Sequence, residues 1–335
     1  MKIAILSTPH LPTPPPGHGG SEMVAGLLAA GLAREGHEVV VVGHPDSRPG
    51  VPLLTVPEAS RVERFDWREL AHVGRALPRL HDVDLIHNHC VNAGPPLAAL
   101  APRPMLTTLH YIHPLTRCFP DHPYVAVSHS QRRQAEGLRV VSTIWHGIDV
   151  EAYRLEERKD DYLLFLGRVS PNKGPDVAIA VARRLGCRLV LAGPVLGTDD
   201  YFDQRIRPQL DRSIAYVGEV QGREKVELLA RARCLVLPLR WEEPFGLVMV
   251  EAMACGTPVV ATRRGAAPEL VRHGVTGFLV DSTEEFVAAV SRVHALRPAD
   301  CRRHVAAHFT VERMVAAYLR VYRQVLEQAE DAPWS

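Results

Sequence analysis

Two glutamates lie eight residues apart in the most informative stretch of this 335-residue chain, which begins at Glu243 and reads EPFGLVMVEAMACGTPVV. At roughly 3.6 residues per turn, a helix over this stretch places Glu243 and Glu251 about two turns apart, so both carboxylates can face one ligand. The neighbours of Glu251 are apolar, and unpaired glutamate is rarely buried, so its carboxylate is expected to have a bound partner. Glu243 taken alone is equally consistent with an ordinary acid in a first helical turn.

Backbone N–H groups at the start of the same helix supply complementary chemistry. Four amides are expected as unpaired donors at this positive helix end, and they belong to Phe245, Gly246, Leu247 and Val248. Amides in this position bind a phosphate or a row of sugar hydroxyl groups. Two acids separated by an amide cluster therefore suit a ligand in which a sugar is joined to a phosphate.

One strand must precede this helix and another must follow it to hold the two glutamates in place. The apolar runs CLVLPL and PVVAT, which begin at Cys234 and Pro258, predict these buried strands. Pro244 suits the first turn of the intervening helix, and Gly256 is typical of the position just after a helix end. The stretch is therefore predicted to form a strand, helix, strand unit.

The chain opens with the same alternation of elements, because the strand-like run KIAIL precedes a glycine-containing loop, a helical pattern and the strand-like run HEVVVVG. Ser21 is a plausible N-cap of this helix, and Gly36 a plausible stop. The loop fails as a dinucleotide fingerprint, since Gly17 and Gly19 are followed by Glu22 where the third glycine belongs. A nicotinamide enzyme is therefore disfavoured.

Polar side chains also follow other predicted strands. His110 closes the run PMLTTLH, while Arg168 and Lys173 lie in the loop after YLLFLG. These positions are carboxyl ends of strands, the edge at which open α/β sheets bind ligands. On spacing alone, His110 is equally consistent with a satisfied core histidine, and isolated loop cations are usually solvated.

Two patterns that suggest metal binding are discounted. Asp82 and Asp84 form a D-x-D sequence, but they precede the strand LIH and so lie at its amino end, the wrong edge of the sheet for a ligand. His87 and His89 offer two imidazoles, whereas a zinc site requires three or four ligands. We expect neither a bound metal nor a cofactor.

Composition excludes several classes of protein. The 39 basic and 38 acidic residues nearly cancel, so no general attraction to nucleic acid is implied. No run approaches 18 apolar residues, so integral membrane association is not expected. The six cysteines are scattered without a C-x-x-C pair, which fits a reducing cytoplasm and indicates neither a disulfide framework nor a zinc site.

The stretch from Glu243 resembles the E-x7-E signature of glycosyltransferase family 4, the glycosyl transferases group 1, whose members are retaining enzymes. In that family the first glutamate holds hydroxyls of the donor sugar and the second holds the ribose of the nucleotide. The resemblance therefore implies these roles for Glu243 and Glu251, with the amides of residues 245–248 also at the donor. One departure is Leu239-Arg240-Trp241, where many members carry a serine.

The second half of the chain carries two more features of the family. The sequence GRVSPNKG resembles its diphosphate clamp, G-R-x-S-x-x-K-G, which implies that Arg168 and Lys173 hold the leaving group. Val220 falls where relatives hold the nucleobase. The implied donor site therefore draws on several separate loops of this half.

The first half carries two further matches. Relatives have a T-x-H sequence whose histidine lies beside the donor sugar at the reaction centre, and His110 matches it. Gly19 and Gly20 match glycines that approach the donor diphosphate and the acceptor, although His18 replaces a tyrosine of the family pattern. These three residues complete the predicted site.

The resemblance implies the GT-B fold, an α/β architecture of two facing Rossmann-like domains with an interdomain cleft. We expect an acceptor domain over residues 1–152 and a nucleotide-sugar donor domain over residues 160–309. The charged segment 151–161 is expected as the linker. A C-terminal helix over about residues 310–330 is expected to cross back to the first domain.

The implied activity is that of a metal-independent hexosyltransferase. It would move a hexose from a nucleotide diphosphate sugar, with UDP-sugars favoured, to a hydroxyl of a small soluble acceptor by a front-face, retaining mechanism. Two alternatives are a nucleotide-sugar epimerase of the same fold and a non-catalytic protein that binds nucleotide sugars. Acceptor identity lies beyond the sequence, because acceptor contacts come from variable loops.

Overall fold

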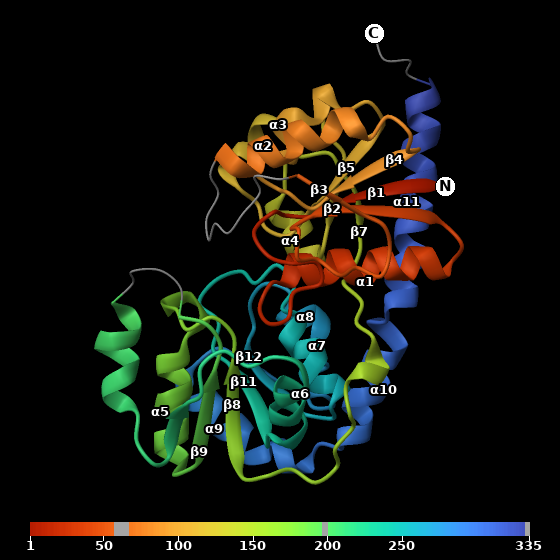
Figure 1. The fold of residues 1–335 in the computed structure, drawn as a ribbon. Helices are drawn as coiled ribbons and strands as arrows, with labels where there is room; N and C mark the ends of the chain where they lie inside the picture. Colours follow the sequence, from red (N-terminus) through yellow and green to blue (C-terminus); the bar gives the residue numbers. More distant parts are fainter. Residues whose placement is uncertain (57–66, 196–199, 332–335) are drawn as a thin grey trace. The chain divides into compact units, whose positions relative to one another are not determined.

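The computed structural model describes residues 1–56, 67–195 and 200–331. The chain forms two compact units, which we call unit 1 and unit 2. Unit 1 comprises Met1–Gly147 together with Val311–Ser335, and unit 2 comprises Ile148–Thr310. Each unit contains one parallel sheet with helices, as drawn in Figure 1, so the predicted pair of Rossmann-like α/β domains is confirmed.

Unit 1 has a seven-stranded parallel sheet in the order β3-β2-β1-β4-β5-β6-β7. Its strands are β1 (Lys2–Leu6), β2 (Glu38–Gly43), β3 (Leu53–Thr55), β4 (Leu85–Asn88), β5 (Met105–Leu109), β6 (Tyr124–Ala126) and β7 (Val140–Thr143). Its α-helices are α1 (Gly20–Arg34), α2 (Trp67–Ala76), α3 (Gly94–Leu97), α4 (His129–Gln134) and α11 (Val311–Asp331). The strand order reverses between β1 and β4, which places the carboxyl-end loops of these strands at the position where such sheets bind ligands.

The helix α11 packs against unit 1 although it follows unit 2 in sequence. A Cβ atom added at Gly31 of α1 would lie only 2.5 Å from Val315 of α11, so glycine permits this close helix contact. Tyr318 and Tyr322 of α11 are fully buried. The last helix is therefore a structural part of unit 1.

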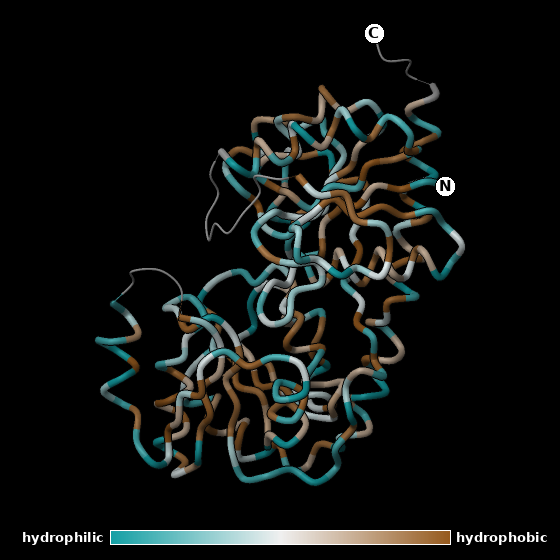
Figure 2. The backbone as a smooth tube through the Cα atoms, viewed as in Figure 1, coloured by the Kyte–Doolittle hydropathy of each residue, from teal (hydrophilic) through white to brown (hydrophobic). Residues whose placement is uncertain are grey.

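Unit 2 has a six-stranded parallel sheet in the order β10-β9-β8-β11-β12-β13. Its strands are β8 (Tyr162–Leu166), β9 (Arg188–Ala192), β10 (Ile214–Tyr216), β11 (Cys234–Leu237), β12 (Val259–Thr262) and β13 (Gly277–Val280). Its α-helices are α5 (Pro175–Leu185), α6 (Gly222–Arg231), α7 (Leu247–Ala254), α8 (Ala267–Leu270), α9 (Thr283–Arg292) and α10 (Pro298–His308). The strands are predominantly brown in Figure 2 and the outer segments of each unit predominantly teal, because parallel strands are buried on both faces.

Two helix starts differ from those expected from sequence. The cap of α1 is Gly19, with φ of 125°, whereas the Ser21 hydroxyl donates to Glu22 at 2.9 Å instead of capping the helix. The helix α7 begins at Leu247 rather than just after Pro244, because Gly246 has a left-handed backbone with φ of 88°. Both corrections depend on glycine conformations that few other residues adopt.

The charged segment 151–161, which the sequence suggested as a linker, is bonded into unit 2. The Lys159 ammonium donates to Ala230 O at 2.7 Å, to Thr257 Oγ1 at 2.9 Å and to Cys255 O at 3.1 Å.

Among the helices of the described residues, none combines the length and apolar content needed to span a membrane.

Candidate functional site

In unit 2, Lys173 and Glu243 form an ion pair, although they are 70 residues apart in sequence. Lys173 follows β8, and Glu243 follows β11, the neighbouring strand. Trp241 completes the arrangement, since its indole N–H donates to Glu243 Oε2 at 3.0 Å and the Lys173 ammonium lies 4.8 Å from its ring centroid. Glu243 is only 8% exposed, so a cation and an N–H donor offset the cost of burying its charge.

Close backbone contact between two loops brings Lys173 and Glu243 together. Gly174, with φ of 73°, lies so near the other loop that an added Cβ would meet Pro238 O at 2.1 Å. The Arg240 amide donates to Asn172 O at 2.8 Å, and its guanidinium pairs with Asp176 at 2.6 Å. The departure from the family pattern at residues 239–241 therefore joins the two loops that carry the predicted site.

The loop after β12 supports Glu243 from a third side. The Ala266 amide donates to Glu243 O at 2.9 Å, and the Gly265 amide donates to the Glu242 carboxylate at 2.7 Å. Gly265 has φ of 56°, and a Cβ there would lie 2.3 Å from Glu243 N. Three loops at the carboxyl edge of this sheet therefore fix the position of the Glu243 backbone.

The start of α7 lies within the four residues whose amides are predicted to bind the donor, 245–248. Leu247 and Val248 open the helix, so no carbonyl four residues earlier lies within it to accept from their N–H groups. Gly246 caps the helix, and its carbonyl accepts from Met249 N at 2.9 Å. Phe245 lies before the helix and is buried, with its ring 6.3 Å from that of Phe309. The amides of Leu247 and Val248 are therefore placed to bind an anion.

Glu251 has partners within the protein that the sequence did not reveal. Its Oε1 accepts from Lys225 Nζ at 2.7 Å and from Tyr153 OH at 2.9 Å, and the residue is 3% exposed. Burial, with the charge of Glu251 beside it, raises the pKa of Tyr153 well above its usual range, so its hydroxyl remains a donor. Lys225 lies on α6, shortly after the buried Val220. Lys225 and Glu251 therefore form a further charged pair in unit 2, with a carboxylate that is almost fully buried.

Arg168 differs from the other predicted donor-site residues. It follows β8 and is exposed, and its side chain forms no hydrogen bond or ion pair with the residues that the structure describes. The structure therefore joins Lys173 to Glu243 and gives Glu251 a separate cation, but it leaves the Arg168 guanidinium available to a ligand.

In unit 1, His110 directly follows β5 and belongs to a group of stacked histidines. Its Nε2 lies 2.8 Å from His89 Nδ1, and its ring centroid lies 5.6 Å from that of His146. The His87 ring centroid lies 4.4 Å from that of His89, with the two rings tilted by 40°. His87 and His89, which the sequence indicates only as discounted metal ligands, thus lie close to the predicted catalytic histidine.

Burial keeps these imidazoles neutral. It lowers the pKa of His110 to about 4 and that of His87 to about 3, and it also lowers the pKa of His89. His89 Nε2 is buried without a hydrogen-bond partner among the described residues. Since buried unpaired N–H groups are rarer than unpaired acceptors, His89 Nδ1–H is assigned as the donor to His110 Nε2. His110 then carries its own proton on Nδ1.

Gly19 and Gly20 lie where the loop after β1 enters α1. The buried Glu22 accepts from the hydroxyl of Thr8 and from that of Ser21. An added Cβ at Gly19 would lie 2.9 Å from Glu22 Oε2, so the glycine leaves room for this carboxylate. The residue that breaks the dinucleotide fingerprint therefore orders the glycine loop.

A polar cluster in unit 1 was not predicted from sequence. Glu69 is 2% exposed, and its carboxylate lies 3.2 Å from His10 Nε2 and 3.3 Å from Asn92 Nδ2. The Tyr111 hydroxyl, on a partly exposed ring, donates to Asn92 Oδ1 at 2.7 Å. These residues come from α2 and from segments after β1, β4 and β5, so no local motif could have connected them.

The discounted D-x-D sequence lies at the opposite edge of the sheet. Asp84 accepts from Lys2 N at 2.8 Å, and Asp82 forms an ion pair with the Lys2 ammonium, where β4 and β1 begin. Within the described ranges, no group of three or more His, Cys, Asp and Glu residues has the arrangement of a metal site.

Comparisons with known proteins agree with this architecture. A family model described as glycosyltransferase family 4 matches residues 18–152, and one described as glycosyl transferases group 1 matches residues 160–295. The D-inositol 3-phosphate glycosyltransferase of Mycobacterium avium (strain 104) is 31% identical over 213 residues, or 55% of this chain and 50% of that protein. The chain thus spans about half the length of this curated relative.

Solved structures match nearly the whole chain. AviGT4, a glycosyltransferase involved in avilamycin A biosynthesis, is 29% identical with a TM-score of 0.80, and the match covers 98% of both chains. Anabaena Alr3699/HepE in complex with UDP and glucose is 22% identical with a TM-score of 0.78, and the match covers 97% of this chain and 100% of that one. The predicted fold class is confirmed, and the chain belongs to glycosyltransferase family 4, the glycosyl transferases group 1.

Proposed function

We propose that this chain is a retaining hexosyltransferase that moves a hexose from a nucleotide diphosphate sugar to a hydroxyl of a small soluble acceptor. UDP-sugars are the favoured donors, and no metal or cofactor takes part. The observation that carries the proposal is the pairing of Lys173 with Glu243 beside the first amides of α7. A cation, a carboxylate and helix amides are the groups that a sugar joined to a diphosphate requires.

The ion pair prepares both residues for this ligand. Lys173 would exchange Glu243 for oxygens of the diphosphate, and Glu243 would then accept hydrogen bonds from the sugar hydroxyls. Negative charge grows on the diphosphate as its bond to the anomeric carbon breaks. Lys173, the available guanidinium of Arg168 and the amides of Leu247 and Val248 would stabilise that charge without a metal.

The acceptor oxygen would form its bond to the anomeric carbon on the face from which the diphosphate departs. The proton of the acceptor hydroxyl passes to an oxygen of the leaving phosphate. Because the new bond forms on the face that the old bond leaves, the anomeric configuration is retained. His110, with its proton on Nδ1, would donate a hydrogen bond to the donor sugar. This role rests on the family match and on the tautomer assigned from the His89 contact.

The nucleoside would bind through Glu251 and Val220. A carboxylate held by Lys225 and Tyr153 is preorganised to accept from ribose hydroxyls, and the buried Val220 offers apolar contact to the base. The similar Alr3699/HepE structure is a complex with UDP, which supports the choice of donor.

Unit 1 would bind the acceptor. The cluster of Glu69, Asn92 and Tyr111 offers carboxylate, amide and phenol groups that suit a ligand with several hydroxyls. Gly19 and Gly20 would allow the ligand a close approach to the backbone. The similar AviGT4 is a glycosyltransferase involved in avilamycin A biosynthesis, and this likeness favours a small acceptor. All six cysteines are unpaired, consistent with a place in the reducing cytoplasm.

The test is incubation with labelled nucleotide sugars and a panel of hydroxyl acceptors, followed by mass spectrometry. Formation of an acceptor–hexose product with the donor's anomeric configuration, determined by NMR, would support the proposal. Release of an altered sugar without an acceptor would indicate the epimerase, and binding without turnover would indicate the non-catalytic protein. Activity should persist in EDTA, and loss of activity that manganese restores would overturn the metal-independent mechanism.

A further inference from the structure

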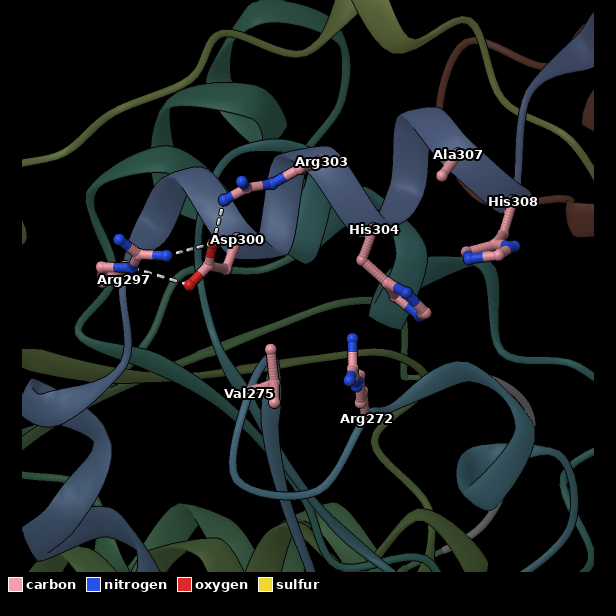
Figure 3. Close-up of a pocket in the computed structure, with 8 residues that line it drawn as sticks. All are labelled: Arg272, Val275, Arg297, Asp300, Arg303, His304, Ala307 and His308. Carbon is pink, nitrogen blue, oxygen red and sulfur yellow. Dashed lines mark hydrogen bonds and ion pairs between the residues drawn. The ribbon is translucent and has the colours of Figure 1, made fainter.

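A pocket of about 440 Å³ lies in unit 2 between α10 and the segment that joins α8 to β13. Figure 3 shows Arg272 and Val275 of that segment facing the side chains of α10. None of the residues around the pocket belongs to the candidate donor site described above. Its charged and imidazole side chains are Arg272, Arg297, Asp300, Arg303, His304 and His308.

The charges in this pocket do not balance. Arg297 contacts Asp300 through two hydrogen bonds, of 2.8 Å and 3.0 Å, and Arg303 pairs with the same carboxylate. One acid therefore holds two guanidinium groups, which leaves one positive charge in excess. Arg272 adds another, because its side chain forms no hydrogen bond or ion pair with any residue in the described parts of the chain. The pocket is thus cationic before any ligand binds.

Two features limit what a ligand would lose on binding. Asp300 pairs with both Arg297 and Arg303, which holds two exposed guanidinium groups on the same side of the pocket. The His304 ring is fixed as well, since its Nε2–H donates to Leu270 O at 2.9 Å. Its centroid lies 5.0 Å from that of His308, which places two imidazoles side by side on α10.

We propose that this pocket binds a phosphorylated small molecule, separately from the nucleotide sugar. The planar guanidinium group matches the oxygens of a phosphate, and it presents paired N–H donors to them. The volume falls in the range of small-molecule sites, about 300–1,000 Å³, so there is room for more than the phosphate itself. Val275, from the segment before β13, and Ala307, on α10, also line the pocket and offer apolar contacts to the carbon part of the ligand.

The test is calorimetric titration of the full chain with glucose 6-phosphate, with unphosphorylated glucose as the control ligand. Because the donor site also attracts phosphate, each titration is repeated with UDP at saturation. We expect glucose 6-phosphate to bind in the millimolar range or tighter with UDP present, and more tightly than glucose, which can also enter the hexose site beside UDP. Inorganic phosphate and pyrophosphate, measured in parallel, distinguish recognition of the phosphate group from recognition of the whole ester.

The deciding variant is Arg272→Gln, and its matched control is Arg212→Gln. Arg212 is also exposed in unit 2, and its loss changes the net charge equally. Loss of a charge-assisted hydrogen bond should weaken the phosphate probes about tenfold or more in Arg272→Gln, with Arg212→Gln unchanged. A UDP titration of each variant verifies that unit 2 is folded.

Three results would overturn the proposal. In the first, no phosphate probe binds once UDP is saturating. In the second, Arg272→Gln and Arg212→Gln weaken binding of the phosphate probes equally. In the third, glucose gives a binding signal equal to that of glucose 6-phosphate. Vesicles of anionic phospholipid form a separate arm of the experiment. Binding to vesicles that depends on Arg272, without binding of the soluble phosphates, would assign the pocket to a membrane surface instead.

Discussion

His89 Nδ1 lies 2.8 Å from His110 Nε2, and the second nitrogen of His89 is buried without a partner among the described residues. This relationship predicts which nitrogen of His110 carries the proton, namely Nδ1. Nitrogen-15 NMR of the imidazoles distinguishes the two neutral tautomers directly. In His89→Phe, which cannot donate, His110 should populate both tautomers, and kcat/KM should fall about tenfold through loss of one positioned hydrogen bond. A protonated Nε2 on His110 in the unaltered protein would contradict the assignment.

The ion pair of Lys173 and Glu243 predicts different effects on stability and on turnover. Lys173→Met leaves the buried Glu243 carboxylate without its cation, so the free energy of unfolding should fall by about 3–5 kcal/mol. The double variant Lys173→Met/Glu243→Gln removes both charges and should recover most of that stability, as measured by urea denaturation. Its kcat should nevertheless remain about 10²–10³ below normal, because the charge on the leaving diphosphate loses its cation. Recovery of turnover with stability would show that Lys173 has only a structural role.

The close contact at Gly174 can be tested with a matched glycine. Gly174 and Gly186 both have left-handed backbones, with φ of 73° and 62°, but only Gly174 faces another loop, with Pro238 O at 2.1 Å from an added Cβ. Alanine at either position should cost about 1–2 kcal/mol of stability for the backbone strain. Gly174→Ala should cost more, and it alone should lower kcat, because it separates the loops of Lys173 and Glu243. Equal losses in denaturation and activity assays would contradict this account of the contact.

Much of the fold and part of the site follow from local sequence patterns. Apolar runs ended by proline or glycine mark the strands, and Lys173 and Glu243 follow neighbouring strands closely enough that a shared sheet edge brings them together. The start of α7 could not be predicted, since it depends on the left-handed backbone of Gly246. Glycine in a sequence permits that conformation but does not require it.

The other features of the site that the sequence does not predict depend on contacts between residues far apart in the chain. Tyr153 and Lys225 lie 98 and 26 residues from Glu251, and neither belongs to a motif. The apolar neighbours of Glu251 predict that its carboxylate has a bound partner. They do not predict that side chains of the protein itself provide that partner. The sequence indicates His89 only as a discounted metal ligand, because nothing in it shows that β4 and β5 place His89 against His110.

Buried histidines predict how the stability of the protein depends on pH. Burial lowers the pKa of His72 and His110 to about 4 and that of His87 to about 3, against about 6.5 in an unfolded chain. Below pH 6.5 the unfolded state therefore binds protons that the folded state excludes. The free energy of unfolding should fall as pH drops from 6.5 towards 4, by up to about 1.4 kcal/mol per pH unit for each such histidine.

Urea denaturation at several pH values between 7.5 and 5 measures this slope. His72→Gln removes one of the titrating groups while keeping a donor near Ser7 O, which the His72 ring contacts at 3.1 Å. The slope should decrease in this variant by the contribution of one proton. A stability that stays constant over this pH range, or a slope that His72→Gln leaves unchanged, would contradict the prediction.

The central claim is that the two glutamates bind different parts of one nucleotide sugar, and titration with UDP tests it most directly. Glu251→Gln should weaken UDP binding by about 1.5–3 kcal/mol, because the ribose loses a charged acceptor. Tyr153→Phe, which removes a contact to Glu251 at 2.9 Å but keeps the carboxylate, serves as the structural control and should weaken UDP binding much less. Glu243→Gln should leave UDP affinity nearly unchanged while lowering kcat/KM for the UDP-sugar. Equal losses of UDP affinity in Glu243→Gln and Glu251→Gln would contradict the claim.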